Sequence, residues 1–220
     1  MKERGMIFNG EMVRAILDGR KTQTRRIMKL QPKPSKSRPG DFWFSSKKLE
    51  SMVHVSDLAP GNSPIADYHL FIQEHCCPFG AVGDRIWVRE TWARYNIDQN
   101  SHDLAYRATT PADWPEEGRW RPSIHMPRWA SRILLEITDV RVERLNAISE
   151  EDAEAEGIDM EALYDSQDCY DCIADHNMTG RPTVTGAFKY LWESIYGEEG
   201  WKSNPWVWVI EFKRVEGGAA

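Results

Sequence analysis

The chain has 220 residues, of which 41% are hydrophobic and 11% aromatic, so it can bury a core and is not expected to be disordered. Its formal charge of −6 argues against a broad basic face, so we expect no general binding along duplex DNA. No apolar run approaches the ~20 residues of a membrane-spanning helix, and the N-terminus lacks the apolar segment of a signal peptide, so we expect a cytoplasmic protein without a membrane partner.

A short helix is predicted near the N-terminus. Asn9 is a good N-cap, and Gly19 can end the helix in a left-handed conformation. Between them, four apolar residues follow the spacing of one helix face: Met12, Val13, Ile16 and Leu17. The next ten residues, 20–29, crowd five basic side chains around two threonines, which is unusual in an acidic chain.

Residues 31–80 differ in character, because proline, lysine and glycine interrupt any regular pattern. Two short segments, 41–46 and 52–58, could pair as a hairpin. We interpret residues 31–80 as an insertion or mobile lobe.

Three strands are predicted further along. Gly83 and Asp84 indicate a turn before the first of them. Apolar residues alternate in the second, 131–145, with a change of phase near Asp139 that indicates a bulge. The last strand is the clearest, because four residues alternate on one face: Trp206, Trp208, Ile210 and Phe212.

Two further helices are predicted. One begins at the N-cap Ser149, has acidic residues in its favourable first turn and ends near Gly157. The other covers residues 186–197, with an apolar face. The polar, acidic residues 158–183 between them are interpreted as a second insertion.

These elements predict an α+β fold. We expect one domain over residues 1–216, built as a small, mostly antiparallel, curved β-barrel with peripheral helices and the two insertions. Residues 217–220 are expected to form a flexible tail.

Common catalytic motifs are absent, which disfavours nucleotide hydrolases of the usual type, serine hydrolases and zinc proteases. A zinc site is one alternative for the thiols. Its candidate ligands would be Cys169, Cys172 and His176, with His75, Cys76 and Cys77 as the other half. Adjacent cysteines fit one tetrahedral ion poorly, so we favour unbound thiols, no metal and no cofactor.

Tryptophans on strand and helix faces are predicted to lie in the core: Trp192, Trp206 and Trp208. Three others lie in a polar, proline-rich segment and could form a binding surface or a loop clamped over the barrel: Trp114, Trp120 and Trp129.

Two features of the sequence could support proton transfer. Lys21 and Thr24 follow the end of a helix and are expected in a turn, which brings residues three apart together. The neighbouring Arg20, Arg25 and Arg26 would lower the pKa of Lys21 by repulsion, and a neutral lysine could take a proton from Thr24 or from water. The alternative is a solvated basic loop.

The second feature is Glu156, which lies at the C-terminal end of its predicted helix. A negative charge is unfavourable there, so this carboxylate is a candidate for proton transfer. An ordinary exposed acid is the alternative.

Four segments in this order resemble the ASCH domain, a small β-barrel family related to the PUA RNA-binding fold. They are "ILDGRKTQTRR", "GDRIWVRETW", "LLEITDVRVERLNAISEEDAEAEGI" and "WVWVIEFKRV", and together they cover roughly half of the chain. The length and the tryptophan-rich segments look most like the larger ASCH proteins of phage and prophage genes. The two insertions have no counterpart in the smallest members.

Some small ASCH proteins are amidohydrolases that remove the acetyl group from N4-acetylcytidine. The resemblance implies the same reaction on an N4-acylated cytidine-type nucleoside, with Lys21 as base, Thr24 as the hydroxyl that it activates and Glu156 as proton shuttle to the departing amine. Arg20 and its basic neighbours Arg25 and Arg26 would then contact the substrate.

Two other functions stay open. The chain could bind RNA or a modified base without catalysis, since other members of these families bind RNA. It could also be a phage-encoded protein-interaction scaffold that contacts a host protein through its insertions. Fold alone does not decide between these functions.

Overall fold

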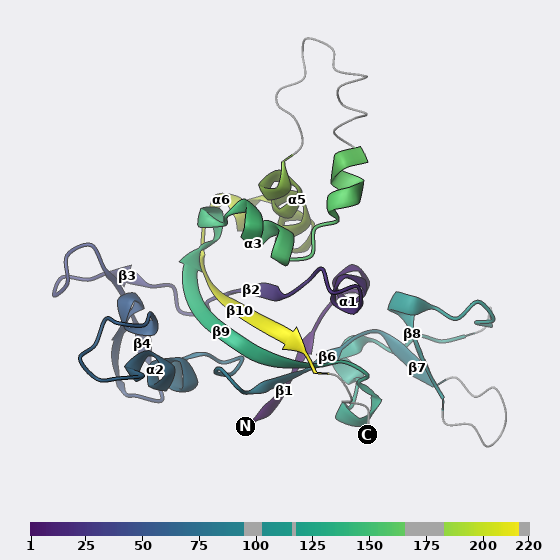
Figure 1. Ribbon diagram of the computed structural model, residues 1–220, viewed down its shortest axis with the longest axis horizontal. Helices are drawn as coiled ribbons and strands as arrows, with labels where there is room; N and C mark the ends of the chain where they lie inside the picture. The colour runs from purple at the N-terminus through teal and green to yellow at the C-terminus, as the bar shows by residue number, and fades with distance from the viewer. Residues whose placement is uncertain (95–102, 116–117, 166–182, 216–220) are drawn as a thin grey trace, which may run out of the picture.

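The computed structural model describes residues 1–94, 103–115, 118–165 and 183–215. It confirms the α+β class, with a mixed five-stranded sheet at its centre (Figure 1). In spatial order the strands are β1 (Glu3–Ile7), β6 (Arg85–Arg89), β9 (Leu134–Arg144), β10 (Trp206–Arg214) and β2 (Gln23–Ile27). Strands β1 and β6 run parallel, and every other neighbouring pair in this sheet is antiparallel.

The long strands β9 and β10 give the sheet its curvature (Figure 1). Glu211 faces Asp139, whereas Phe212 faces Ile137, so β9 carries one extra residue at this point. This is the bulge predicted near Asp139. A bulge of this kind bends its strand and increases the local twist.

Strands β1 and β2 are the two edges of the sheet, and one side chain spans them. Arg26 donates a hydrogen bond of 2.8 Å to the carbonyl of Ile7, and its guanidinium lies 5.2 Å from the centre of the Phe8 ring. Within the described residues the backbones of β1 and β2 do not pair. A closed barrel therefore stays a prediction.

The three predicted helices begin and end close to where the sequence predicts. In helix α1 (Gly10–Leu17), the side chain of Asn9 accepts a hydrogen bond from the N–H of Met12, and Gly19 follows with a φ of +78°. The side chain of Ser149 caps α3 (Glu150–Ala155) in the same way. The third predicted helix is α5 (Val184–Tyr196). Two helical segments of this region were not predicted: α6 (Glu198–Lys202) and residues 160–165. None of the helices described here is both long and apolar enough to cross a membrane.

Strand β10 is buried on both faces. The four residues predicted to share a face all lie in the larger core: Trp206, Trp208, Ile210 and Phe212. On the other face, Val207 and Val209 pack with Phe188 and Trp192 of α5 in a second core. Helices α3, α5 and α6 gather on this side of the sheet (Figure 1).

The first predicted insertion packs against the central sheet. It holds a small sheet of β3 (Lys33–Pro34), β4 (Phe42–Ser46) and β5 (Ser51–His54), followed by α2 (Tyr68–Cys76). Strands β4 and β5 form the predicted hairpin, whereas α2 lies where we predicted no helix. Phe44 is buried in the larger core, with its ring 6.2 Å from that of Trp208, so this region is not a separate lobe.

The proline-rich tryptophans lie beside a second hairpin, β7 (Trp92–Arg94) and β8 (Leu104–Tyr106). The rings of Trp114 and Trp120 stack on each other with their centres 4.1 Å apart, and both are half-buried. Trp129 is 57% exposed and packs edge-on against Trp92. Trp129 is therefore the member of this group with the most surface free for a partner.

Candidate functional site

Lys21 and Glu156 lie side by side although 135 residues separate them. They form an isolated antiparallel bridge, and Thr22 donates a backbone hydrogen bond of 2.9 Å to the carbonyl of Ala155. Gly157 follows with a φ of +94°, and a Cβ on this glycine would lie 2.9 Å from the Cβ of Lys21. A glycine at 157 therefore permits the close approach that the pair needs.

The two side chains form a buried ion pair. Nζ of Lys21 donates hydrogen bonds of 2.7 Å to Oε2 and to the backbone carbonyl of Glu156. The Lys21 side chain is 0% exposed and that of Glu156 is 3% exposed. Burial lowers the pKa of Lys21; Glu156 opposes this shift, and Arg26 and Arg25 add to it. The direction agrees with the prediction, but the main cause is loss of solvent rather than repulsion between cations.

The predicted turn at Lys21 and Thr24 is wrong. Thr24 lies in β2, where it faces Ile210 of β10. The chain is extended here because its backbone groups bond to α3 and β10 instead of to one another. Among the described residues, no hydrogen bond joins the side chains of Lys21 and Thr24, and the amine of Lys21 instead reaches Glu156.

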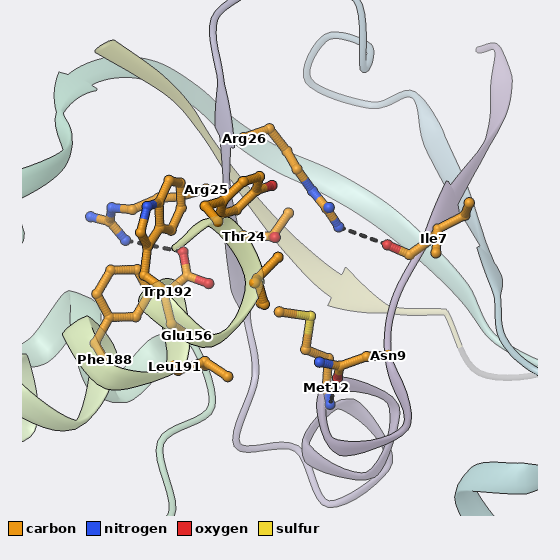
Figure 2. Close-up of a pocket in the computed structure, with 12 residues that line it drawn as sticks. Ile7, Asn9, Met12, Thr24, Arg25, Arg26, Glu156, Phe188, Leu191 and Trp192 are labelled. Carbon is orange, nitrogen blue, oxygen red and sulfur yellow. Dashed lines mark hydrogen bonds and ion pairs between the residues drawn. The ribbon is translucent and has the colours of Figure 1, made fainter. Parts of the chain in front are cut away.

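Glu156 and Thr24 share a cavity of about 190 Å³ (Figure 2). Their side chains and that of Met12 point into a common space between α1, β2 and α5. Helix α5 supplies an aromatic wall that consists of Phe188, Trp192 and Tyr196. Lys21 does not line this cavity, so the carboxylate of Glu156 connects the buried amine to it.

Arg25 holds Glu156 from a second direction. Its side chain is 0% exposed and donates to Oε1 of Glu156 at 3.2 Å, to Asp152 at 2.7 Å and to Glu143 at 3.2 Å. Burial alone would raise the pKa of Asp152, but the nearby Arg25 and Arg141 lower it. The Nη donors of Arg25 are thus used within the protein, where they orient Glu156.

Arg26 and Arg20, the other two predicted substrate-binding arginines, line two different cavities. Arg26 lines the cavity while its Nη2 is bonded to Ile7. Arg20 bonds to the carbonyl of Gly157 at 3.0 Å and to Asp18 at 3.1 Å. It lines a second cavity that also reaches Glu156.

Three residues that line the aromatic cavity keep a buried N–H without a partner among the described residues: Arg25 at Nε, Arg26 at Nε and Trp192 at Nε1. Each of these three nitrogens is shielded from solvent, so in this conformation none of them is open to the cavity.

The sequence did not predict two parts of this site. The sequence placed the apolar face of α5 in the core and did not predict that it lines a cavity. The length of this apolar face could have indicated the cavity, because Ile195 and Tyr196 extend the face beyond the core and are 44% and 39% exposed. Nothing in the sequence pattern indicated that Asp152 and Glu143 would share Arg25.

The cysteines show no metal site in the part of the chain that the structure describes. Cys76 and Cys77 are free thiols, and no group of three or more potential ligands gathers among the described residues. The remaining candidates, Cys169, Cys172 and His176, lie outside those residues.

Cys77 is expected to resist alkylation by iodoacetamide at pH 8 in the folded protein. Burial raises the pKa of its thiol to about 11, and only the thiolate reacts. Peptide mapping by mass spectrometry should show Cys77 unmodified before unfolding in urea and modified after it. Labelling of folded Cys77 at the rate of an exposed thiol would contradict its placement.

Comparison with known family models, with curated proteins and with solved structures finds no match. The fold and the site together define an α+β protein in which a buried lysine–glutamate pair opens, through the glutamate, to an aromatic-walled cavity that also holds a threonine hydroxyl.

Proposed function

We propose that this protein is an amidohydrolase of the ASCH type that acts on an N4-acylated cytidine-type nucleoside. The observation that carries the proposal is the placement of Glu156: it is bonded to the buried amine of Lys21 and faces the same cavity as Thr24. A proton acceptor, a relay and a hydroxyl are the groups that hydrolysis of an amide requires.

In the proposed mechanism, the hydroxyl oxygen of Thr24 attacks the acyl carbon. Its proton passes to the carboxylate of Glu156 and on to the neutral amine of Lys21. The bond from the acyl carbon to N4 of cytosine then breaks, and the proton returns through Glu156 to N4. Water hydrolyses the ester left on Thr24, which releases the carboxylic acid and restores the hydroxyl.

The cavity walls support a nucleoside as substrate. A flat base can stack on the aromatic side chains of α5, which line the cavity that also holds Thr24 and Glu156. In this proposal the curved sheet is a PUA-like barrel whose seam lies between β1 and β2, and the chain is a larger, phage-type member of the family.

A binding module for a modified base or RNA without catalysis is the second candidate. The same aromatic wall favours it, because stacking needs no proton transfer. The third possibility, an interaction scaffold, cannot be tested cleanly by deleting residues 31–80, because Phe44 and Val53 of that region belong to the larger core.

Hydrolysis of N4-acetylcytidine tests the proposal. The purified protein is expected to convert it to cytidine and acetate, followed by the change in ultraviolet absorbance and by mass spectrometry. N4-propionyl- and N4-benzoylcytidine extend the test to larger acyl groups. A folded protein that turns over none of the three would rule out the hydrolase, and measurable binding of the same compounds without turnover would favour the binding module.

A further inference from the structure

A serine, a histidine and an aspartate lie side by side at the small sheet of β3, β4 and β5. Oγ of Ser35, just after β3, lies 3.0 Å from Nε2 of His54, the last residue of β5. Oδ2 of Asp57 lies 3.8 Å from Nδ1 of the same imidazole ring. A hydroxyl, an imidazole and a carboxylate in this order are the groups of a serine hydrolase, which is recognised by geometry and not by sequence position.

The carboxylate of Asp57 orients the imidazole of His54. It favours the ring proton on Nδ1, which leaves Nε2 able to accept a hydrogen bond from Ser35. Because 3.8 Å is longer than a hydrogen bond, Asp57 acts on the ring through its charge. The side chains of His54 and Asp57 are only 12% and 9% exposed, so solvent screens this charge little. Arg38 holds the other carboxylate oxygen at 2.7 Å.

The hydroxyl of Ser35 is directed towards His54. Its oxygen accepts a hydrogen bond of 3.1 Å from the backbone N–H of Arg38, so its own proton is left to be donated. Oγ of Ser37 lies 3.1 Å away and Nε2 of His54 lies 3.0 Å away. The imidazole nitrogen is the more basic of these two acceptors. The same backbone N–H stabilises the oxygen of Ser35 when that oxygen gains negative charge.

Ser35 and His54 line a cavity of about 430 Å³. Two apolar side chains and two lysines also line it: Trp43, Met52, Lys33 and Lys36. No acidic residue of the described part of the chain lines this cavity. A carbonyl oxygen that becomes negative beside Ser35 would therefore lie in a positive field, and a flat leaving group could pack against Trp43.

We infer that Ser35 and His54 form a second catalytic site, which hydrolyses short-chain carboxylic esters. Oγ of Ser35 attacks the ester carbonyl carbon, and its proton passes to Nε2 of His54. The bond from the acyl carbon to the alcohol oxygen breaks, and the alcohol leaves with the proton from Nε2. Water then gives a proton to Nε2 and attacks the acyl carbon. The acid is released, and Oγ of Ser35 takes the proton back.

Esters are the expected substrate class because an alcohol leaves more readily than an amine. The reaction thus requires less of a site that stabilises negative charge through lysines and a single backbone N–H. The inference does not depend on the proposed hydrolysis of acylated cytidine. This cavity shares no lining residue with the cavity of Thr24 and Glu156, and β3 and β4 lie at one end of the molecule, away from α1 and α5 (Figure 1).

Reaction with p-nitrophenyl acetate tests the inference. Release of p-nitrophenolate is followed by absorbance, and protein quenched in acid during turnover is mapped by peptide mass spectrometry. The wild-type protein is expected to show a burst of about one p-nitrophenolate per chain and an acetyl group on Ser35. Ser35→Ala is expected to lower the rate about a hundredfold or more. The neighbouring variant Ser37→Ala is expected to keep the acetyl group on Ser35.

A wild-type rate in Ser35→Ala would overturn the inference, as would equal losses in Ser35→Ala and Ser37→Ala or a quenched protein without acetyl-Ser35. Ser35→Cys keeps an acceptor for Arg38 and guards against a loss that comes from unfolding. Its thiol is expected to react with iodoacetamide faster than that of Ser37→Cys, and His54→Gln is expected to remove the difference. Equal rates for the two thiols would contradict activation by His54.

Asp57 is a positioning residue, because it acts only through His54. Asp57→Asn is expected to lower kcat for p-nitrophenyl acetate on the order of tenfold or more and to leave KM unchanged. A rise in KM with unchanged kcat would show that Asp57 only shapes the cavity. Thr24→Val is expected to keep acetylation of Ser35 while it loses turnover of N4-acetylcytidine, so the two proposed activities can fail separately.

Discussion

Replacing Lys21 by methionine is expected to reduce turnover of N4-acetylcytidine by about a thousandfold and to lower the free energy of unfolding by about 3 kcal/mol. The activity falls because the buried proton acceptor behind Glu156 is lost. The stability falls because breaking a buried pair leaves one charge without its partner, although Arg25 remains bonded to Glu156 and limits the loss. Steady-state kinetics and urea unfolding measure the two effects.

A double variant separates chemistry from stability. Adding Glu156→Gln to Lys21→Met removes the unpaired charge, so part of the lost stability is expected to return while turnover stays low. If the pair served folding alone, activity would recover along with stability. Wild-type turnover in Lys21→Met itself would rule out lysine as the base.

The rate of N4-acetylcytidine hydrolysis is also expected to increase with pH, because Lys21 must be neutral to accept a proton. Turnover is expected to rise with pH as the ammonium loses its proton, and because burial lowers the pKa of Lys21, the rise should occur below the ~10.4 of a free lysine. Over the same interval the unfolded chain binds more protons than the folded one, so Lys21 makes stability rise with pH. Lys21→Met is expected to remove this contribution.

Thr24→Val is expected to lower turnover at least a hundredfold with little change in the melting temperature. Valine keeps the branched shape that suits β2 and removes only the hydroxyl that faces the cavity. Thr24→Ser, which restores a hydroxyl, is the matched control and is expected to retain much of the activity. Kinetics on N4-acetylcytidine and thermal unfolding of all three proteins measure the comparison.

An acyl group trapped on the hydroxyl of Thr24 would directly support Thr24 as the nucleophile. Mass spectrometry of protein quenched during turnover is expected to find this ester in the wild-type protein and not in Thr24→Val. If Thr24→Val kept wild-type turnover, Thr24 would only line the cavity and water would be the nucleophile.

Local signals predicted much of the fold. The caps at Asn9 and Ser149, the bulge near Asp139 and the alternating residues of β10 depend on neighbours in the sequence, and all of them are present. The turn at Lys21 failed because tertiary pairing decided the backbone: residues 22 and 24 bond to α3 and β10, which lie far away in sequence. Local propensity has no access to such partners.

Only part of the candidate site could be predicted from the sequence. Lys21 and Glu156 were each unusual alone, but their contact came from a family resemblance and not from spacing. The shared use of Arg25 by Asp152, Glu143 and Glu156 depends on how α3 packs over β9, which no periodicity reports.

The pairing of β2 with β10 sets an order of events during synthesis of the protein. Thr24 lies near the start of the chain, but the strand that positions it, β10, ends at Arg214. Closing such a long loop is slow, because its entropy must be lost before the contacts form. A ribosome-bound chain should therefore carry no assembled site until β10 has emerged, and fragments that lack β10 are expected to be inactive however well their first helix forms.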